Sequence, residues 1–239
     1  MTIYHLLEHS AGVSWVIQAA VLAAVLLVVA ALYVRSQIAA ANGGVVPDEG
    51  VTFRNTIEVI VEGLAGLARE TIGPEWRKWF PLVGAIFFFI LLSNLLGLVP
   101  GVGGATSDVN TGLAWAIIAW CIYTFAGIRH HGFGYITKFM GPAMFDVHLF
   151  GKHFHVRPLA PLMLLIEIPL DLARMGTLTI RLLANMFADH AVVAVWLGLV
   201  PIAVPAIFLG LGLIVCFIQA FVFSLLTMIY IGLALEEAH

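Results

Sequence analysis

One stretch of the chain, residues 167–190, combines the hydrophobicity of a membrane segment with ionisable side chains at helical spacing. At 100° per residue its polar members fall within about 80° of one another and form a single stripe. The stripe contains Glu167, Asp171, Arg174, Arg181, Asn185 and Asp189. Ionisable groups inside a membrane-length segment are costly, and by default they mark an ion or substrate path. These residue types therefore indicate ion transfer rather than a packing role alone.

The charges of this stripe differ in whether a neighbour can neutralise them. Asp171 and Arg174 are three residues apart and can pair, whereas Glu167 lies about 10 Å from Arg174 along the helix. Arg181 has no acidic residue three or four positions away. A guanidinium keeps its charge, and an arginine at mid-membrane costs about 2.5–3.5 kcal/mol. We expect its compensating carboxylate on a partner protein; backbone carbonyls and water between helices are the alternative.

Other polar groups in apolar surroundings have both a functional and a structural interpretation. His190 suits a proton relay, because histidine is a common proton-transfer residue, or it is a histidine at a helix end. Gln219 either lines an ion path or forms a hydrogen bond to a neighbouring helix. The role of Asp189 is open. Further candidates for an access path or a supporting role are Asn94, the one strongly polar group of its segment, and Asp108 and Asn110 in the loop that follows.

Composition indicates a polytopic membrane protein. Of 239 residues, 62% are hydrophobic and only 10% are charged, against about 25% charged in soluble domains. The net charge of −3 gives no indication of nucleic-acid binding. Cys121 and Cys216 fall in apolar segments and are predicted to be buried free thiols.

The polar stretch 129–157 is rich in histidine and is predicted to be a solvated loop. Asp146, His153 and His155 suggest metal ligands at most weakly, because their spacing matches no familiar metal motif. We expect neither a metal nor a cofactor.

Hydropathy and periodicity predict a single all-α membrane domain over residues 1–239. Five apolar segments are long enough to cross a bilayer: 10–34, 79–100, 109–128, 160–190 and 206–235. Residues 51–72 alternate instead between an apolar side, which includes Leu64 and Ala68, and a polar side, which includes Arg54 and Glu58. This amphipathic helix is expected on the membrane surface or against the protein's own spans.

The length of the last two helices is unusual. About 30 residues run without proline between Pro169 and Pro201, and again from Pro205 to the end of the chain. Such helices reach about 45 Å, more than the hydrocarbon core of about 30 Å, so we expect a long, strongly tilted hairpin. Lysine and arginine alternate between loops in a way that predicts the N-terminus outside and the C-terminus in the cytoplasm.

Two short motifs in the C-terminal part of the chain are specific enough to indicate a family. The run 181–186, Arg-Leu-Leu-Ala-Asn-Met, and the run 219–223, Gln-Ala-Phe-Val-Phe, resemble the signatures of subunit a of the F-type ATP synthase, the stator part of its membrane motor. The fragments SNLLGLVPG at 93–101 and SDVNTGLAWA at 107–116 are similar to other parts of that family. The resemblance covers about residues 50–239.

The resemblance implies a role for each residue of the stripe. Arg181 matches the essential arginine that faces the rotor ring of c subunits, and Asn185 and Gln219 match polar groups beside it. Glu167 matches an acidic position on the cytoplasmic access path. His190 matches a position on the opposite path that holds Glu in some members and His in others.

The remaining positions match less closely. Arg174 corresponds to a basic position one heptad before the essential arginine. Met175 stands where the family often has Pro, and Asp189 where relatives often have Gly. Gly212 stands where some members place a His that complements a Glu at position 190, so that pair is rearranged here.

The mechanism that the resemblance implies is ion-driven rotation. An ion enters one half-channel and neutralises a rotor carboxylate, which can then face lipid. It leaves through a second half-channel near Arg181, which blocks direct passage between the two by repulsion. The implied partners are the c-ring, the peripheral-stalk b subunits, the rest of the F1Fo complex and membrane lipid. The implied location is the bacterial inner membrane, with an energy-transducing organelle membrane as alternative.

Three other functional classes remain as alternatives. A stand-alone proton or sodium transporter would use the same stripe, although no internal repeat is visible. An intramembrane hydrolase would need a serine near His190 in a nucleophile motif, and none is present. A purely structural anchor would gain nothing from a charged helix. No phosphate-binding GxxxxGK[ST] motif occurs, so we expect no catalytic site in this chain. We take the proton as the default coupling ion. The sequence does not distinguish coupling to H⁺ from coupling to Na⁺.

Overall fold

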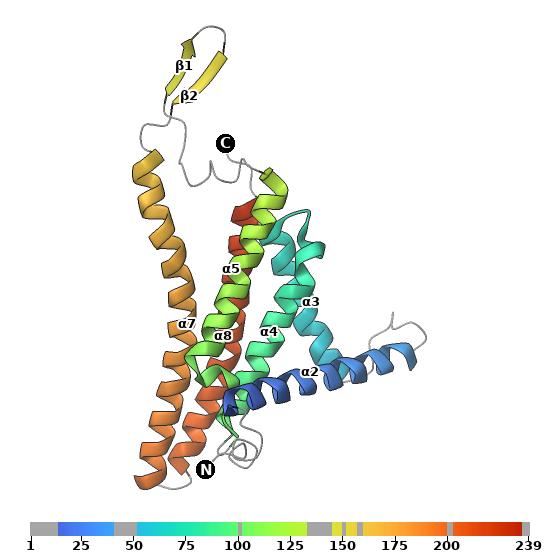
Figure 1. Ribbon diagram of the computed structural model, residues 1–239. Coiled ribbons are helices and arrows are strands. Elements are labelled where there is room, and N and C mark those ends of the chain that lie inside the picture. The colour runs from blue at the N-terminus through green and yellow to red at the C-terminus, as the bar shows by residue number, and fades with distance from the viewer. Residues whose placement is uncertain are drawn as a thin grey trace.

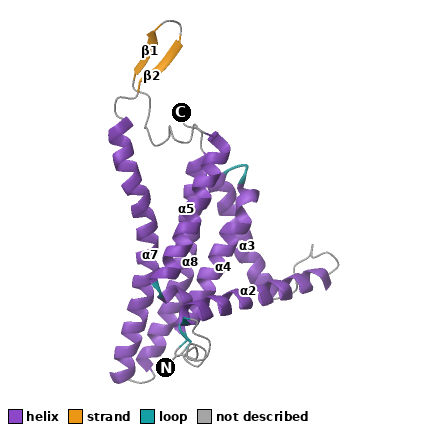
Figure 2. Cartoon of the chain, viewed as in Figure 1, coloured by secondary structure: helices purple, strands orange, loops and turns teal. Residues whose placement is uncertain are grey.

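The computed structural model describes residues 14–40, 52–99, 102–132, 145–149, 152–156, 160–199 and 203–235. Six long helices make up most of this part of the chain (Figure 1, Figure 2). They are α2 (Trp15–Ala40), α3 (Phe53–Ile72), α4 (Trp76–Leu98), α5 (Val109–His131), α7 (Ala160–Leu199) and α8 (Ala203–Leu235), with a short 3₁₀ helix η1 (Ala105–Ser107) before α5.

The predicted all-α membrane architecture is confirmed. Five helices are long and apolar enough to cross a bilayer: Trp15–Ala39, Trp76–Leu98, Val109–His131, Pro169–Trp196 and Pro205–Leu235. The sixth, α3, is the amphipathic helix. Thr52 caps it by accepting a hydrogen bond from the Asn55 backbone N–H through its hydroxyl, and Gly73 (φ 80°) ends it. The chain is therefore a multi-pass membrane protein.

Helix α8 is the centre of the packing. It contacts α3, α4, α5 and α7, and these contacts form one continuous apolar core. Phe87 and Ile90 of α4, Leu182 of α7, and Phe223 and Ile231 of α8 are completely buried there. The α8 helix thus supports α7, which carries the charged stripe, from behind.

Helices α7 and α8 form the long antiparallel hairpin that the chain length predicts. They contain 40 and 33 residues, or about 60 Å and 50 Å at 1.5 Å per residue. Helix α2 runs crosswise to both of them and contacts α4 and η1 (Figure 1). Because α2 and the hairpin run in different directions, they cannot all follow the membrane normal, and helices this long must tilt.

Two expectations about single residues are wrong. Arg54, assigned to the polar side of the amphipathic helix, is 2% exposed, and its Nε donates to Glu58 Oε1 at 2.7 Å. Burial is tolerated because the acid one turn later meets the charge. Cys121 is an exposed free thiol, whereas Cys216 is free and buried as expected. Apolar surroundings in a membrane segment do not distinguish an inward from an outward position.

The stretch expected to be a solvated loop contains a small antiparallel hairpin. Strand β1 (Phe145–Leu149) pairs with β2 (Lys152–Val156), with Asp146 opposite His155 and His148 opposite His153. The side chains of both strands lie outside the described set, and so do the metal ligands considered for them. The rest of 133–159 lies outside the described residues.

Candidate functional site

The first part of the stripe on α7 is neutralised within the chain. Arg174 donates through Nη1 to Asp171 Oδ1 at 2.8 Å, as their spacing of three predicts. Its guanidinium carbon also lies 5.3 Å from the ring centroid of Tyr230 on α8, in cation–π range. Asp171 is buried and Arg174 is partly buried. Glu167 lies on α7 one turn earlier, and its side chain is outside the described set.

Arg181 is in a different situation. It is exposed on the outer side of α7, next to Ile180 and near Phe187, which are 64% and 74% exposed. The inner side of the same turns, with Leu178 and Leu182, is buried against α5 and α8. Within the part of the chain that the structure describes, Arg181 has no hydrogen bond or ion pair. Its charge therefore points away from the fold.

Polar and aromatic contacts set the register of the hairpin. Asn185 donates through Nδ2 to Gln219 Oε1 at 2.8 Å, and Gln219 is buried. Toward the turn, the rings of Trp196 and Phe208 stack with centroids 6.0 Å apart. The structural interpretation of Gln219, a hydrogen bond to a neighbouring helix, is observed directly. This bond holds an amide pair one turn beyond Arg181.

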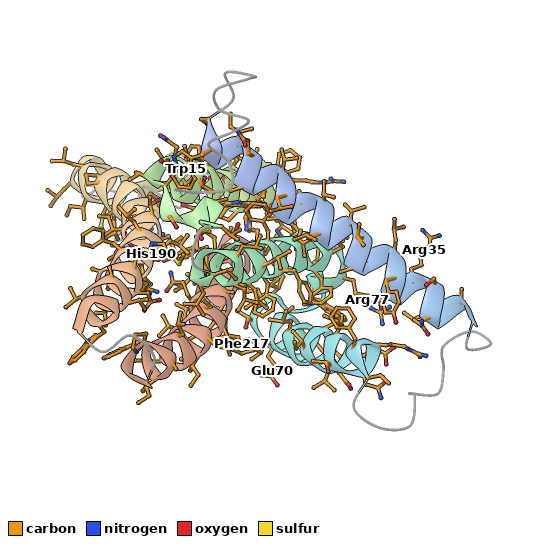
Figure 3. The ribbon with its side chains drawn as sticks, turned by 90° about the horizontal axis from the view of Figure 1, so that it is seen from below. Trp15, Arg35, Glu70, Arg77, His190 and Phe217 are labelled. Carbon is orange, nitrogen blue, oxygen red and sulfur yellow. The ribbon has the colours of Figure 1, made fainter. Side chains whose placement is uncertain are left out.

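A second polar group forms where α7 meets the end of α4. The imidazole Nε2 of His190 lies 2.8 Å from the carbonyl oxygen of Gly97, and Figure 3 shows His190 where α7 faces α4. A β-carbon at Gly97 would displace Met186 Cε, the flexible end of a side chain, and would lie 3.3 Å from Gly104 Cα, which is tighter than ordinary contact, so glycine suits this close approach. His190 is not at a helix end, because α7 continues to Leu199.

Polar residues at the end of α4 and in the loop that follows it form hydrogen bonds with one another. The Thr106 hydroxyl donates to Asn94 Oδ1 at 2.7 Å, and both side chains are buried. Asp108 caps α5 by accepting from the Asn110 backbone N–H at 2.8 Å, and both residues are near the surface. The structure thus brings Asn94 and His190 to the same end of α4, whereas Asp108 has a structural role at the start of α5.

Sequence reasoning missed several partners in this group. The carbonyl of Gly97 carries no side-chain signal, and Thr106 is an ordinary loop residue in the sequence. Tyr230, an aromatic residue of the last helix, lies beneath the Arg174 guanidinium. Each contact joins different elements, so helical spacing could not reveal it.

Comparison with known proteins identifies the family. The family described as ATP synthase A chain matches residues 15–232, nearly the whole chain. The chain belongs to the ATP synthase subunit a family. ATP synthase subunit a of Bdellovibrio bacteriovorus is 38% identical over 206 residues, covering 86% of this chain and 84% of the relative. The subunit a of Trichlorobacter lovleyi is 43% identical over 186 residues, covering 78% and 75%.

Another relative extends the match further along the chain. ATP synthase subunit a of Geotalea uraniireducens is 39% identical over 213 residues, covering 89% of this chain and 86% of the relative. Family membership makes this chain a proton-translocating membrane component of the Fo sector, without a catalytic site of its own. The resemblance seen in the two C-terminal motifs is confirmed at the level of the family.

Proposed function

We propose that this chain supplies two ion half-channels and the arginine that faces the rotor ring, and so couples ion flow to rotation and ATP synthesis. One observation carries the proposal: Arg181 is exposed on the outer side of α7, while the other arginine of the stripe is neutralised internally. An ionised group on the outer face of a membrane helix needs a partner outside the fold. A carboxylate on a moving c subunit meets that need.

The surface around Arg181 supports a close approach by another helix. Positions 173, 177, 184, 188 and 191 are exposed, and all are alanine or threonine. Small residues allow helix backbones to approach closely in membranes. A rotor helix can therefore approach Arg181 along this strip of small residues, whereas the large exposed side chains Ile180 and Phe187 lie about 100–120° around the helix from Arg181. A stand-alone transporter is less well supported. The ionised groups of such a transporter would face the interior of its own helix bundle, whereas Arg181 faces outward.

The outward position of Arg181 explains the order of the electrostatic steps. A rotor carboxylate that has bound a proton is neutral and can turn through lipid, whereas an ionised one cannot. On losing its proton it is attracted to Arg181, whose charge also repels protons that would pass directly between the half-channels. Each proton crossing 100 mV supplies about 2.3 kcal/mol, so ATP synthesis at partner subunits needs several crossings.

Two groups of residues suit the half-channels. At one end, Glu167, with Asp171 and Arg174, lies toward the start of α7. At the other end, His190 contacts the carbonyl of Gly97, three residues after Asn94 on α4. Asn185 and Gln219 lie between these ends and hold the two helices in register beside Arg181.

The loop charges and the relatives named above support the placement of the chain in its membrane. Lysine and arginine alternate between loops as the positive-inside rule requires for an outside N-terminus and a cytoplasmic C-terminus. The relatives named above are bacterial, in accord with the inner membrane as the location. The peripheral-stalk b subunits, which the resemblance to subunit a implies as partners, are proposed as partners in the complex.

Disulfide crosslinking in the assembled complex tests this proposal. In a background with Cys121→Ser, which removes the exposed native thiol, Ala184→Cys should crosslink to a cysteine next to the rotor carboxylate. Ala24→Cys on α2 is the matched control, because it is also an exposed alanine in an apolar helix. The proposal fails if Ala184→Cys crosslinks to no rotor position, or only as weakly as Ala24→Cys.

A further inference from the structure

The turn between α3 and α4 holds two arginines against one tryptophan. The guanidinium carbons of Arg69 and Arg77 lie 5.4 Å and 5.6 Å from the centroid of the Trp76 ring, within cation–π range. Both arginines are exposed, whereas Trp76 is partly buried. Because Gly73 ends α3 at φ 80° and α4 begins at Trp76, the two helices place both charges beside the same indole. We call Arg69, Trp76 and Arg77 the arginine corner.

The fold gives the two arginines of this corner no acidic partner. Neither side chain forms a salt bridge or a hydrogen bond within the part of the chain that the structure describes. No Asp or Glu lies three or four positions from either one along the sequence. Like charges held beside one ring repel each other. An anion bound to both guanidinium groups would replace that repulsion by attraction.

Further cations reach the same end of the helix bundle, where α3 and α5 end and α4 begins (Figure 1). The Lys78 ammonium donates to Glu75 Oε1 and is the first cause of the lowered pKa of that carboxyl. The charges of His130 and Arg129, in the last turn of α5, lower the same pKa further. The other acid of this turn, Glu70, is exposed and forms no salt bridge among the described side chains. Two acids therefore face a larger number of cations here, and the excess charge is positive.

The arginine corner lies where a membrane segment begins. Trp76 is the first residue of a helix that is long and apolar enough to cross a bilayer. Its ring packs edge-to-face on Phe80 with centroids 5.7 Å apart, and both residues are partly buried. Tryptophan is enriched at the level of the lipid headgroups, so we expect the two guanidinium groups beside it at the same depth. The loop charges predict the cytoplasmic side for this turn, where the membrane surface attracts basic segments.

We propose that the arginine corner binds the phosphate of one anionic phospholipid headgroup. A phosphate between the two guanidinium groups can accept hydrogen bonds from both, since each presents a planar fork of donors. A lipid suits this place better than free phosphate, because its acyl chains add apolar contact where α4 enters the bilayer. This inference is independent of the proposed function, since it concerns neither Arg181 nor the half-channels.

A lipid-labelling experiment on the complete ATP synthase tests the inference. The complex is placed in nanodiscs of phosphatidylcholine that contain increasing fractions of phosphatidylglycerol with a photoreactive acyl chain. After irradiation and digestion by a protease that does not cut at arginine, mass spectrometry measures the label on the α3–α4 turn. Phosphatidylglycerol should saturate this turn, whereas phosphatidylcholine with the same photoreactive chain should label it only weakly. Equal labelling by the two lipids would overturn the inference, because it would show apolar contact alone.

Removing the two guanidinium groups should weaken the binding of the lipid. Each cation near an anionic surface strengthens binding about fivefold, so Arg69→Gln with Arg77→Gln should raise the half-saturating lipid fraction about 25-fold. Arg35→Gln is the matched control, because it removes an exposed arginine near the end of another apolar helix, α2, and should change nothing. An unchanged half-saturating fraction in the assembled double variant would overturn the inference.

A charge-preserving variant decides the question if the double glutamine variant does not fold. Arg69→Lys with Arg77→Lys keeps both charges but lacks the planar fork of donors. Its half-saturating lipid fraction should rise several-fold, less than in the glutamine variant. Binding equal to that of the wild type would contradict the role of the guanidinium pair.

Two other occupants of the corner would give different results. Displacement of the lipid label by a large excess of inorganic phosphate, but not by chloride at the same ionic strength, would assign the corner to free phosphate. Loss of a partner subunit from the folded double glutamine variant, but not from Arg35→Gln, would assign it to an acidic segment of a partner protein. Either result overturns the lipid assignment, and neither bears on Arg181, because no readout here is ATP synthesis.

Discussion

Arg174 and Arg181 lie two turns apart on the same helix, yet their charges are met in different ways. Arg174 pairs with Asp171 at 2.8 Å and lies over the Tyr230 ring, so its charge has a partner within the fold. Arg181 faces outward and has no such partner in the described part of the chain. An internal ion pair stabilises a helix hairpin, whereas an outward charge is useful only when another molecule meets it. We propose that this difference separates a structural arginine, Arg174, from a functional one, Arg181.

The largest expected effect comes from removing each arginine in turn. Arg181→Ala should lower proton-driven ATP synthesis about 100-fold or more, because the rotor carboxylate loses the charge that attracts it. Arg174→Ala should cost less, about tenfold at most, because its charge already has a partner within the fold. The rates are measured in inverted vesicles with equal amounts of assembled complex. Equal losses for the two variants would remove the distinction between them.

Breaking the internal pair from its acidic side should affect stability more than transport. Asp171→Asn leaves the partly buried Arg174 without its carboxylate, and we expect a loss on the order of 1 kcal/mol, discounted because Arg174 is 31% exposed. The measurement is the denaturant midpoint of the purified complex. The double variant Asp171→Asn with Arg174→Gln should recover part of the loss. No recovery would mean that the pair is not the source of the effect.

The amide pair beside Arg181 should contribute less. Gln219→Leu removes the acceptor of Asn185, and interhelical hydrogen bonds in membrane proteins are worth about 0.6 kcal/mol on average. A double-mutant cycle with Asn185→Leu, read from the same denaturant midpoint, isolates the pair. A coupling energy of zero would show that packing alone sets the register of the hairpin here.

The smallest effect is expected at the exposed ion pair before α4. The Lys78 ammonium, 2.5 Å from Glu75 Oε1, lowers the pKa of that carboxyl below its ordinary value. Its stabilising contribution is therefore complete above the ordinary pKa of about 4.3 and is lost as pH falls through the lowered pKa. Comparing the wild type with Glu75→Gln across this range should show a slight, salt-sensitive difference. A difference that grows as pH falls would contradict the sign.

Local periodicity accounts for what could be predicted from the sequence. The apolar segments predicted the membrane helices, and the three-and-four spacing placed Leu64 and Ala68 on the buried side of α3. Spacing also predicted the Asp171–Arg174 pair and the absence of a local acid for Arg181. These statements depend on residues three or four apart on one helix, whose geometry is known before the fold is.

Only the tertiary structure decided which groups meet between helices. Asn185 and Gln219 are 34 residues apart, and His190 and Gly97 are 93 apart. The burial of Arg54 likewise depends on which side of its helix faces a neighbour. The sequence by itself determined the helices, the charged stripe and the isolation of Arg181. Packing decided the rest, because the register and rotation of one helix against another come from the fit of all their side chains together.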